Sequence, residues 1–117
     1  ESIRFFETVQ AKLPGVHTRL YTAGDPLDRN TALALAKAGL KEVRFSIKID
    51  DPPEKIEKVL SRIALAREIF PDVMVEMPVI PGSEEQMYDL LLKLDAIGVD
   101  GINLLEFCFP LTNSPAY

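Results

Sequence analysis

The sequence predicts an α/β protein whose sheet is an arc of a TIM-like (β/α) barrel, with about four parallel strands and with helices on its outer face. The first observation is a repeating unit of roughly 28 residues, in which an apolar strand, turn residues, a helix and a glycine follow one another. The second is that one helix separates consecutive strands, which makes them parallel. The third is their number, because a closed and filled barrel takes about eight strands. Four strands therefore form an open arc with two unpaired edges.

Four apolar runs bounded by turn residues predict the strands. They lie at residues 17–22, 42–49, 73–80 and 101–107. Four helices alternate with the strands, because apolar side chains recur on one face at helical spacing. These helices begin near residues 3, 26, 53 and 84. The segment after residue 107 is predicted to be a loop or an interrupted further unit.

Residues with capping chemistry mark the helix ends. Asp25 is predicted to be the N-cap of the second helix, with Pro26 at its first position. Ser83 and Gln86 have the spacing of a capping box at the start of the fourth helix. Three helices are predicted to end in a left-handed glycine that an apolar residue follows. These glycines are Gly15, Gly39 and Gly98.

The composition narrows the class of protein. The chain has 117 residues, of which 47% are hydrophobic and 26% charged, as expected for one soluble domain covering residues 1–117. Its net charge of -5 argues against nucleic acid as a partner, because phosphate binding needs clustered Lys and Arg. The chain has no apolar run long enough for a membrane span and no signal-peptide pattern. We therefore expect a cytoplasmic protein that has no membrane partner.

Cysteine use and the N-terminus add two expectations. Cys108 is the only cysteine, so it cannot form an intramolecular disulfide or supply the three or four ligands of a zinc or iron-sulfur site. A small buried or exposed side chain is a better interpretation of Cys108 than a nucleophile. The chain lacks an initiator Met and begins in a helical pattern, which suggests a piece cut from something longer.

Polar residues mark the strand ends, where parallel α/β proteins bind ligands. Arg44, Ser46 and Lys48 alternate with apolar residues, so one face of their strand is polar. This face either lines a barrel interior that holds a polar ligand or simply meets solvent. His17 lies near a strand start and is not expected to be catalytic.

Two carboxylates stand in apolar strands. Glu76 interrupts the run VMVEMPVI, and burial of an unpaired carboxylate costs several kcal/mol. We therefore predict a cationic partner for Glu76, with Arg44 or Lys48 as the candidates. A structural ion pair and a ligand-binding role both remain open. Glu106 raises the same question in the fourth strand.

The segment Pro81-Gly82-Ser83 opens the fourth helix and could cradle an anion. Glu84 and Glu85 occupy the first turn of that helix, where they would satisfy the helix dipole and repel a phosphate. Helix capping is therefore the favoured interpretation.

Four motifs occur in order, one in each strand-helix unit: LYTAG, VRFSIKID, VEMPVIPG and GINLLEF. Between about Gly15 and Phe107, they resemble the radical S-adenosylmethionine (radical SAM) superfamily, in particular an uncharacterised group related to pyruvate formate-lyase activating enzymes. The resemblance implies a (β/α)6 barrel in which a [4Fe-4S] cluster held by CxxxCxxC reductively cleaves SAM. That cysteine motif is absent from this chain. SAM and the cluster would therefore belong to the longer parent protein, and this chain alone is not expected to bind either.

The resemblance also implies which strand ends contact SAM. Ser46 and Lys48 would approach its ribose and carboxylate, although many relatives have Asp at the position of Lys48. Residues 80–82 would lie near the adenine. With the two strand carboxylates added, the candidate cofactor-binding residues are Thr22, Gly24, Ser46, Lys48, Glu76, Ile80, Pro81, Gly82 and Glu106.

Two other interpretations are a complete, small, doubly wound α/β binding or regulatory module, which would have helices on both sheet faces, and half of another TIM-barrel enzyme. The open arc also predicts self-association through its edges and exposed apolar surface. A cofactor site split across missing strands loses its positioning, so this chain alone is expected to be inactive.

Overall fold

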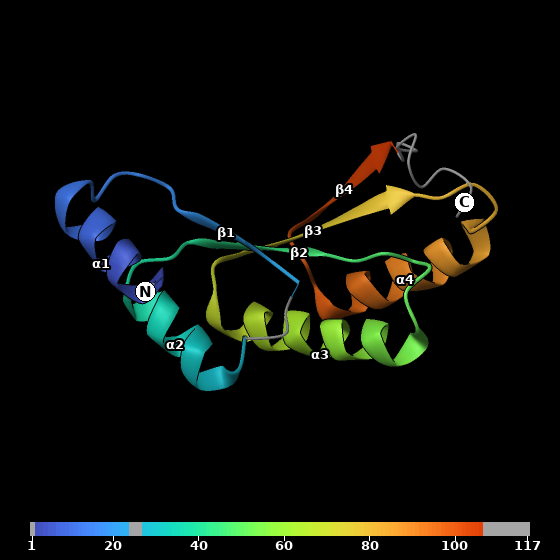
Figure 1. The fold of residues 1–117 in the computed structure, drawn as a ribbon, viewed down its shortest axis with the longest axis horizontal. Helices are drawn as coiled ribbons and strands as arrows, with labels where there is room; N and C mark the ends of the chain where they lie inside the picture. Colours follow the sequence, from blue (N-terminus) through green and yellow to red (C-terminus); the bar gives the residue numbers. More distant parts are fainter. Residues whose placement is uncertain (1, 24–26, 107–117) are drawn as a thin grey trace, which may run out of the picture.

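The computed structural model describes residues 2–23 and 27–106 (Figure 1). One sheet contains four parallel strands in the order β1-β2-β3-β4. The strands are β1 (Arg19–Thr22), β2 (Glu42–Ser46), β3 (Asp72–Val79) and β4 (Gly101–Glu106). The helices are α1 (Ser2–Lys12), α2 (Arg29–Lys37), α3 (Pro53–Ile69) and α4 (Glu84–Ile97).

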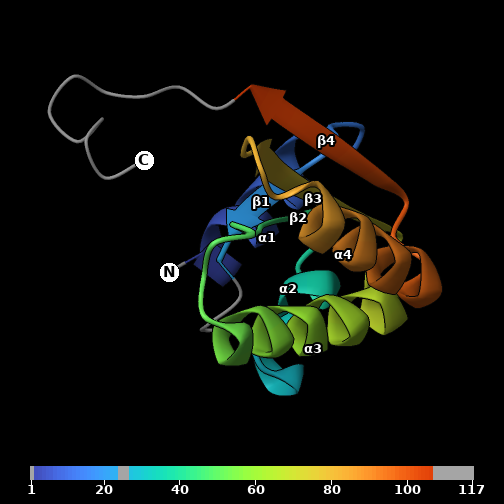
Figure 2. The same cartoon turned by 90° about the vertical axis from the view of Figure 1, so that its right-hand side faces the viewer.

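The helices cover one side of a twisted sheet. Figures 1 and 2 show α2, α3 and α4 beneath the strands, with α1 beside α2 at the β1 end. The strand order never reverses, so successive crossovers place their helices on the same side. The predicted arc of a β/α barrel is confirmed. A doubly wound module is not formed by the described residues, because that fold needs helices on both faces.

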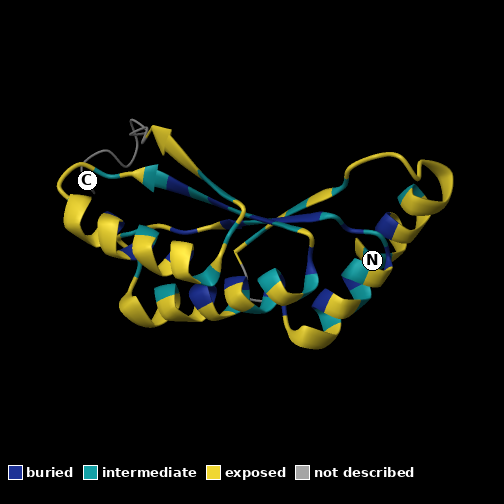
Figure 3. Ribbon diagram, turned by 180° about the vertical axis from the view of Figure 1, so that it is seen from behind, coloured by how far each residue is buried: buried dark blue, intermediate teal, exposed yellow. Residues whose placement is uncertain are grey.

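The core lies between the sheet and the helices. Alternate strand residues on β2 and β3 have less than 2% of their surface exposed and pack against the helices, where they meet Ile63 of α3 and Leu94 of α4. Figure 3 shows this burial along the central strands, while the outer helix faces are exposed. Burial of each such side chain contributes about 1.5–3 kcal/mol. The buried strand residues include Val43, Phe45, Val73, Val75 and Met77.

The start of α2 differs from the prediction. Its N-cap is Asp28, whose side chain accepts a 2.7 Å hydrogen bond from the backbone N–H of Thr31. Asp25 and Pro26 lie outside the described residues, and α2 begins only at Arg29. Asp28 stands three residues before the N–H that it binds, which is the geometry of an N-cap. The prediction of Asp25 as the cap was therefore wrong by one turn.

The capping box predicted for α4 is also wrong in detail. Ser83 is the N-cap residue, but its side chain makes no capping hydrogen bond. Its hydroxyl instead donates to the carbonyl oxygen of Ile80 at 2.5 Å. The carboxylate of Glu84 accepts from the backbone N–H of Gly82 at 3.3 Å. The tight turn at residues 80–83 thus uses the hydroxyl that a capping box would need.

Two of the three predicted glycine ends are confirmed. Gly39 and Gly98 have φ angles of 103° and 88°, a region that residues with a Cβ rarely adopt. After α2, the backbone N–H of Leu40 reaches the carbonyl of Leu35, as a Schellman ending requires. Gly15 does not have a positive φ, so the left-handed ending predicted for α1 is wrong. There the N–H of Val16 bonds to the carbonyl of Leu13 in a short turn.

β2 is three residues shorter than predicted. Beyond Ser46, the N–H of Ile47 still bonds to the carbonyl of Glu76 in β3. The chain then turns, and the N–H of Asp51 bonds to the carbonyl of Lys48. None of the described helices has the length and apolar character needed to cross a membrane.

Candidate functional site

The sheet face opposite the helices carries most of the polar strand side chains, and we call it the open face. Strand pairing arranges its residues in rows across the sheet, because partners in register point to the same side. The three rows, from the amino to the carboxyl ends of the strands, are Arg19-Glu42-Asp72, Tyr21-Arg44-Met74 and Ser46-Glu76-Asn103. Apolar neighbours on β2 and β3 point the other way, into the core.

Glu42 lies at the amino end of β2 and is 6% exposed. Its carboxylate lies 3.1 Å from Nε2 of His17 and 2.6 Å from Nε of Arg19, and it accepts a short hydrogen bond from Nε of Arg44. Burial by itself would raise the pKa of Glu42, but the hydrogen bonds from Arg44, His17 and Arg19 outweigh it and hold the pKa below its ordinary value. Glu42 is therefore an ionised carboxylate held by basic groups.

Arg44 joins this carboxylate to the next strand. Its Nη1 donates to Oε1 of Glu76 at 3.0 Å, and its guanidinium carbon lies 5.8 Å from the ring centre of Tyr21. The hydrogen bond to Glu42 raises the pKa of Arg44 above its ordinary value, burial opposes this rise, and the bond to Glu76 adds to it. The cation predicted for Glu76 is thus Arg44. Lys48, the other candidate, is exposed and lies beyond the end of β2.

Ser46 is the last residue of β2, and its register partner Glu76 lies in the second half of β3. The side chain of Glu76 is 17% exposed, and that of Arg44 is exposed to the same extent. The bond from Arg44 engages Oε1, so Oε2 of Glu76 has no hydrogen-bond donor among residues 2–23 and 27–106. A half-buried carboxylate with one unused oxygen can accept a hydrogen bond from a hydroxyl or ammonium group of a ligand.

Ser46 and Lys48 line a small cavity at the carboxyl end of β2. The cavity has a volume of about 170 Å³, and its wall also includes Asp51 and Lys55, whose charged groups lie 3.4 Å apart. Two lysines beside a serine hydroxyl suit a negatively charged or hydroxylated group. The structure therefore brings Ser46, Lys48 and Glu76 to the same edge of the sheet.

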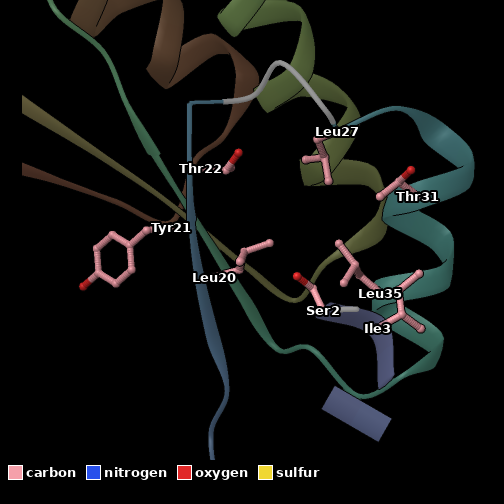
Figure 4. A pocket seen from close by; sticks show the side chains of 8 residues that line it. All are labelled: Ser2, Ile3, Leu20, Tyr21, Thr22, Leu27, Thr31 and Leu35. Carbon is pink, nitrogen blue, oxygen red and sulfur yellow. The ribbon is translucent and has the colours of Figure 1, made fainter. Parts of the chain in front are cut away.

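Thr22 lies at the same sheet edge but on its other face, because it pairs in register with Phe45, which is fully buried in the core. Glu106 is exposed at the end of β4 and pairs in register with Val79, which is 41% exposed. Thr22 lines a separate cavity of about 360 Å³ between β1, α1 and α2. In Figure 4 the Tyr21 ring lies across β1 from Leu27 and Leu35, which belong to this cavity. The candidate residues at the four strand ends therefore do not all lie on one face of the sheet.

The remaining predicted residues lie in loops. Residues 80–82 form the turn before α4, where Gly82 has a φ of 85°. The N–H of Gly82 bonds to the carboxylate of Glu84, and the N–H of Ser83 bonds to the carbonyl of Ile80, so neither donor is left for an anion. Gly24 and Cys108 lie outside the described residues.

Glu42 was missed by the sequence analysis, as were Arg19 and Tyr21 of the same network. One signal was present, because Glu42 continues the alternation of Arg44 and Ser46 along a single strand face. Its partners could not be recognised in this way, since His17 is 25 residues away in the chain.

Cluster-binding ligands are not found in this chain. Within the described residues, no three His, Cys, Asp or Glu side chains are grouped as a metal site would require. The full sequence contains one cysteine, whereas a cluster motif of the CxxxCxxC type needs three. The residues present therefore do not fit a [4Fe-4S] cluster.

Comparison with known proteins gives one informative similarity. No family model matches the chain. The chain is 27% identical over 113 residues to a protein of Methanocaldococcus jannaschii provisionally named as a glycyl-radical enzyme activating enzyme. The match covers 91% of this chain but 30% of that protein. Such activating enzymes belong to the radical SAM superfamily. The chain is thus similar over nearly its whole length to less than a third of an activating enzyme.

Proposed function

We propose that this chain is one section, about four strand-helix units long, of the (β/α)6 barrel of a radical SAM enzyme related to the glycyl-radical enzyme activating enzymes. The supporting observation is the match over 91% of the chain, together with a one-sided parallel sheet whose carboxyl edge is polar. The matched protein is more than three times as long as the match, which is consistent with a longer parent protein.

In that parent, the cysteine ligands and the [4Fe-4S] cluster belong to another part of the polypeptide. The cluster would supply the electron that cleaves SAM reductively. The contribution of this chain is to bind and orient SAM at the sheet edge. Isolated from the cluster, the chain has no source of that electron and is inactive.

Three side chains suit the groups of SAM. Lys48 offers a cation for the methionine carboxylate, and the hydroxyl of Ser46 offers a donor and an acceptor beside it. Oε2 of Glu76 accepts from a hydroxyl or ammonium group. Thr22, Gly24, Glu106 and residues 80–82 remain further candidates at the same edge.

The test uses the longer parent protein, purified without oxygen, with its cluster reconstituted and then reduced. Incubation with SAM is expected to yield 5′-deoxyadenosine and methionine, measured by chromatography and mass spectrometry. Lys48→Ala should weaken SAM binding at least about tenfold, because one charge-assisted hydrogen bond is worth about 1.5–3 kcal/mol.

Lys37→Ala is the matched control. Lys37 is an exposed lysine in the last turn of α2, which leads to the amino end of β2, so it lies at the opposite end of the sheet from the proposed site. It should leave SAM affinity unchanged. The proposal would be rejected if the reconstituted parent protein bound no SAM and released no 5′-deoxyadenosine.

A further inference from the structure

Glu42 stands apart from the proposed SAM-binding residues. It is the one buried charged residue among the residues that the structure describes, and it lies two rows from Glu76, toward the amino ends of the strands. Each pair of residues advances a strand by about 6.6 Å, so Glu42 lies about 13 Å along β2 from Ser46, and its carboxylate is already engaged by His17, Arg19 and Arg44. Its burial and its three basic partners therefore need another explanation.

Arg44 provides the connection. Its Nε donates to Glu42, while its Nη1 donates to Glu76. The guanidinium is planar and rigid, so two acceptors on different nitrogens fix its orientation in the plane. The Tyr21 ring contacts one face of the same group. Without Glu42, the guanidinium could rotate and engage both oxygens of Glu76.

We propose that Glu42 is a positioning residue for the ligand site at the carboxyl edge. It anchors Arg44 from below, and Arg44 then holds Oε1 of Glu76 so that Oε2 remains turned to a ligand. This inference rests on the proposed function for the identity of the ligand, SAM, but the anchoring of Arg44 can be measured without it. His17 binds Oε1 of Glu42, and Arg19 binds the same Oε2 as Arg44, so the network extends from the amino ends of the strands to the site.

The network also determines which chemistry Glu76 accepts. Arg44 is shared between two carboxylates, so it does not fully neutralise Glu76. The free oxygen is therefore best matched by a hydroxyl or ammonium group, and poorly matched by a phosphate or carboxylate.

The first experiment measures SAM affinity of the reconstituted parent protein by calorimetry for Glu42→Gln, Glu76→Gln and the double variant. Glu76→Gln should weaken binding about tenfold, the scale of one hydrogen bond to a charged group. Glu42→Gln should weaken it about three- to tenfold although Glu42 does not touch the ligand, and the double variant should be no weaker than Glu76→Gln alone. If the double variant instead lost affinity by the product of the two single losses, the two residues would act independently and the proposal would be overturned.

Glu68→Gln is the matched control, because Glu68 also pairs with an arginine, Arg29, but lies exposed on the helix layer. It should not change SAM affinity. Arg44→Lys keeps the positive charge but cannot hold two carboxylates through separate nitrogens, so it should reproduce the loss seen in Glu42→Gln. This second variant decides the matter if Glu42→Gln does not fold.

The second experiment needs no ligand. The Nε–H of Arg44 is followed by ¹⁵N NMR in the 117-residue chain, where its exchange with water should be slow in the unsubstituted protein and at least tenfold faster in Glu42→Gln. Unchanged exchange in Glu42→Gln would overturn the proposal. If the parent protein binds no SAM while Arg44 loses its protection as expected, the proposed function fails and the positioning role of Glu42 toward Glu76 stands.

Discussion

Arg44 of β2 donates a 3.0 Å hydrogen bond to Glu76 of β3, although the two residues are 32 positions apart in the chain. Neither side chain lies directly opposite the other in the sheet, since Arg44 pairs in register with Met74 and Glu76 with Ser46. The long arginine side chain spans the two rows. This diagonal pair joins the buried carboxylate of Glu42 to the carboxyl edge of the sheet, and it is the basis for the first two predictions.

Glu42→Ala should lower the free energy of unfolding by about 2 kcal/mol, because it leaves half-buried basic groups without their acceptor. Urea denaturation followed by circular dichroism measures this loss. The exposed pair of Glu68 and Arg29 offers the comparison, and Glu68→Ala should change stability by less than about 0.5 kcal/mol. Equal effects of the two substitutions would contradict the role given to the Glu42 network.

The contribution of Glu42 should depend on pH. Its pKa in the folded protein is lower than in the unfolded chain, so the unfolded chain takes up the proton first as the pH falls. The stabilisation is therefore complete above the ordinary pKa of glutamate, about 4.3, and is lost as the pH falls below that value toward the folded pKa. The stability difference between the unsubstituted protein and Glu42→Gln should shrink over this acidic range in urea titrations. A difference that grew on acidification would have the wrong sign.

Gly39 and Gly98 should respond differently to alanine. Both have positive φ angles, so either substitution costs about 1 kcal/mol in backbone strain. A Cβ at Gly39 would also lie 2.7 Å from Oε1 and 3.0 Å from Cβ of Gln10 on α1, whereas one at Gly98 meets nothing within 4 Å. Thermal unfolding should therefore show a larger fall in melting temperature for Gly39→Ala than for Gly98→Ala. Adding Gln10→Ala should recover part of that loss, and no recovery would mean that the clash with α1 is not its cause.

Self-association of the isolated chain should follow from the outer strands. β1 and β4 each pair on one side alone within the described sheet, and β4 exposes 48% of Leu104 and 40% of Leu105. Such edges pair readily with other chains. Light scattering should show dimers or larger species, and Leu105→Lys should shift the distribution toward monomer. A monodisperse monomer for the unsubstituted chain would refute this expectation.

Much of the fold follows from local patterns. The apolar side chains that recur on the helices and the short apolar runs between them located four helices and four strands. One helix between successive strands made the sheet parallel. The first residues of the helices were less predictable, because several nearby side chains can bond to the same backbone groups. Asp28, and not Asp25, accepts the hydrogen bond that caps α2. The hydroxyl of Ser83 bonds to the carbonyl of Ile80, before the helix, and not to an N–H of α4.

The candidate site was only partly predictable. The interruption of an apolar strand by Glu76 correctly required a cation, because a buried carboxylate needs compensation. The side of the sheet that each residue faces depends on register, which a sequence pattern does not fix between strands. Thr22 therefore faces the helix side, while Ser46 and Glu76 share the open face.

The sequence by itself determined the order of elements, the parallel sheet, the helix-covered arc and the need of Glu76 for a basic partner. These depend on periodicity and on burial, which are properties of each segment. Only the tertiary structure decided that Arg44 binds two carboxylates, and that Glu42 contacts Arg19 of β1 and His17, which precedes β1. The physical reason is that these contacts join groups two rows apart or on different strands, and only the packed and twisted sheet sets the distances between them.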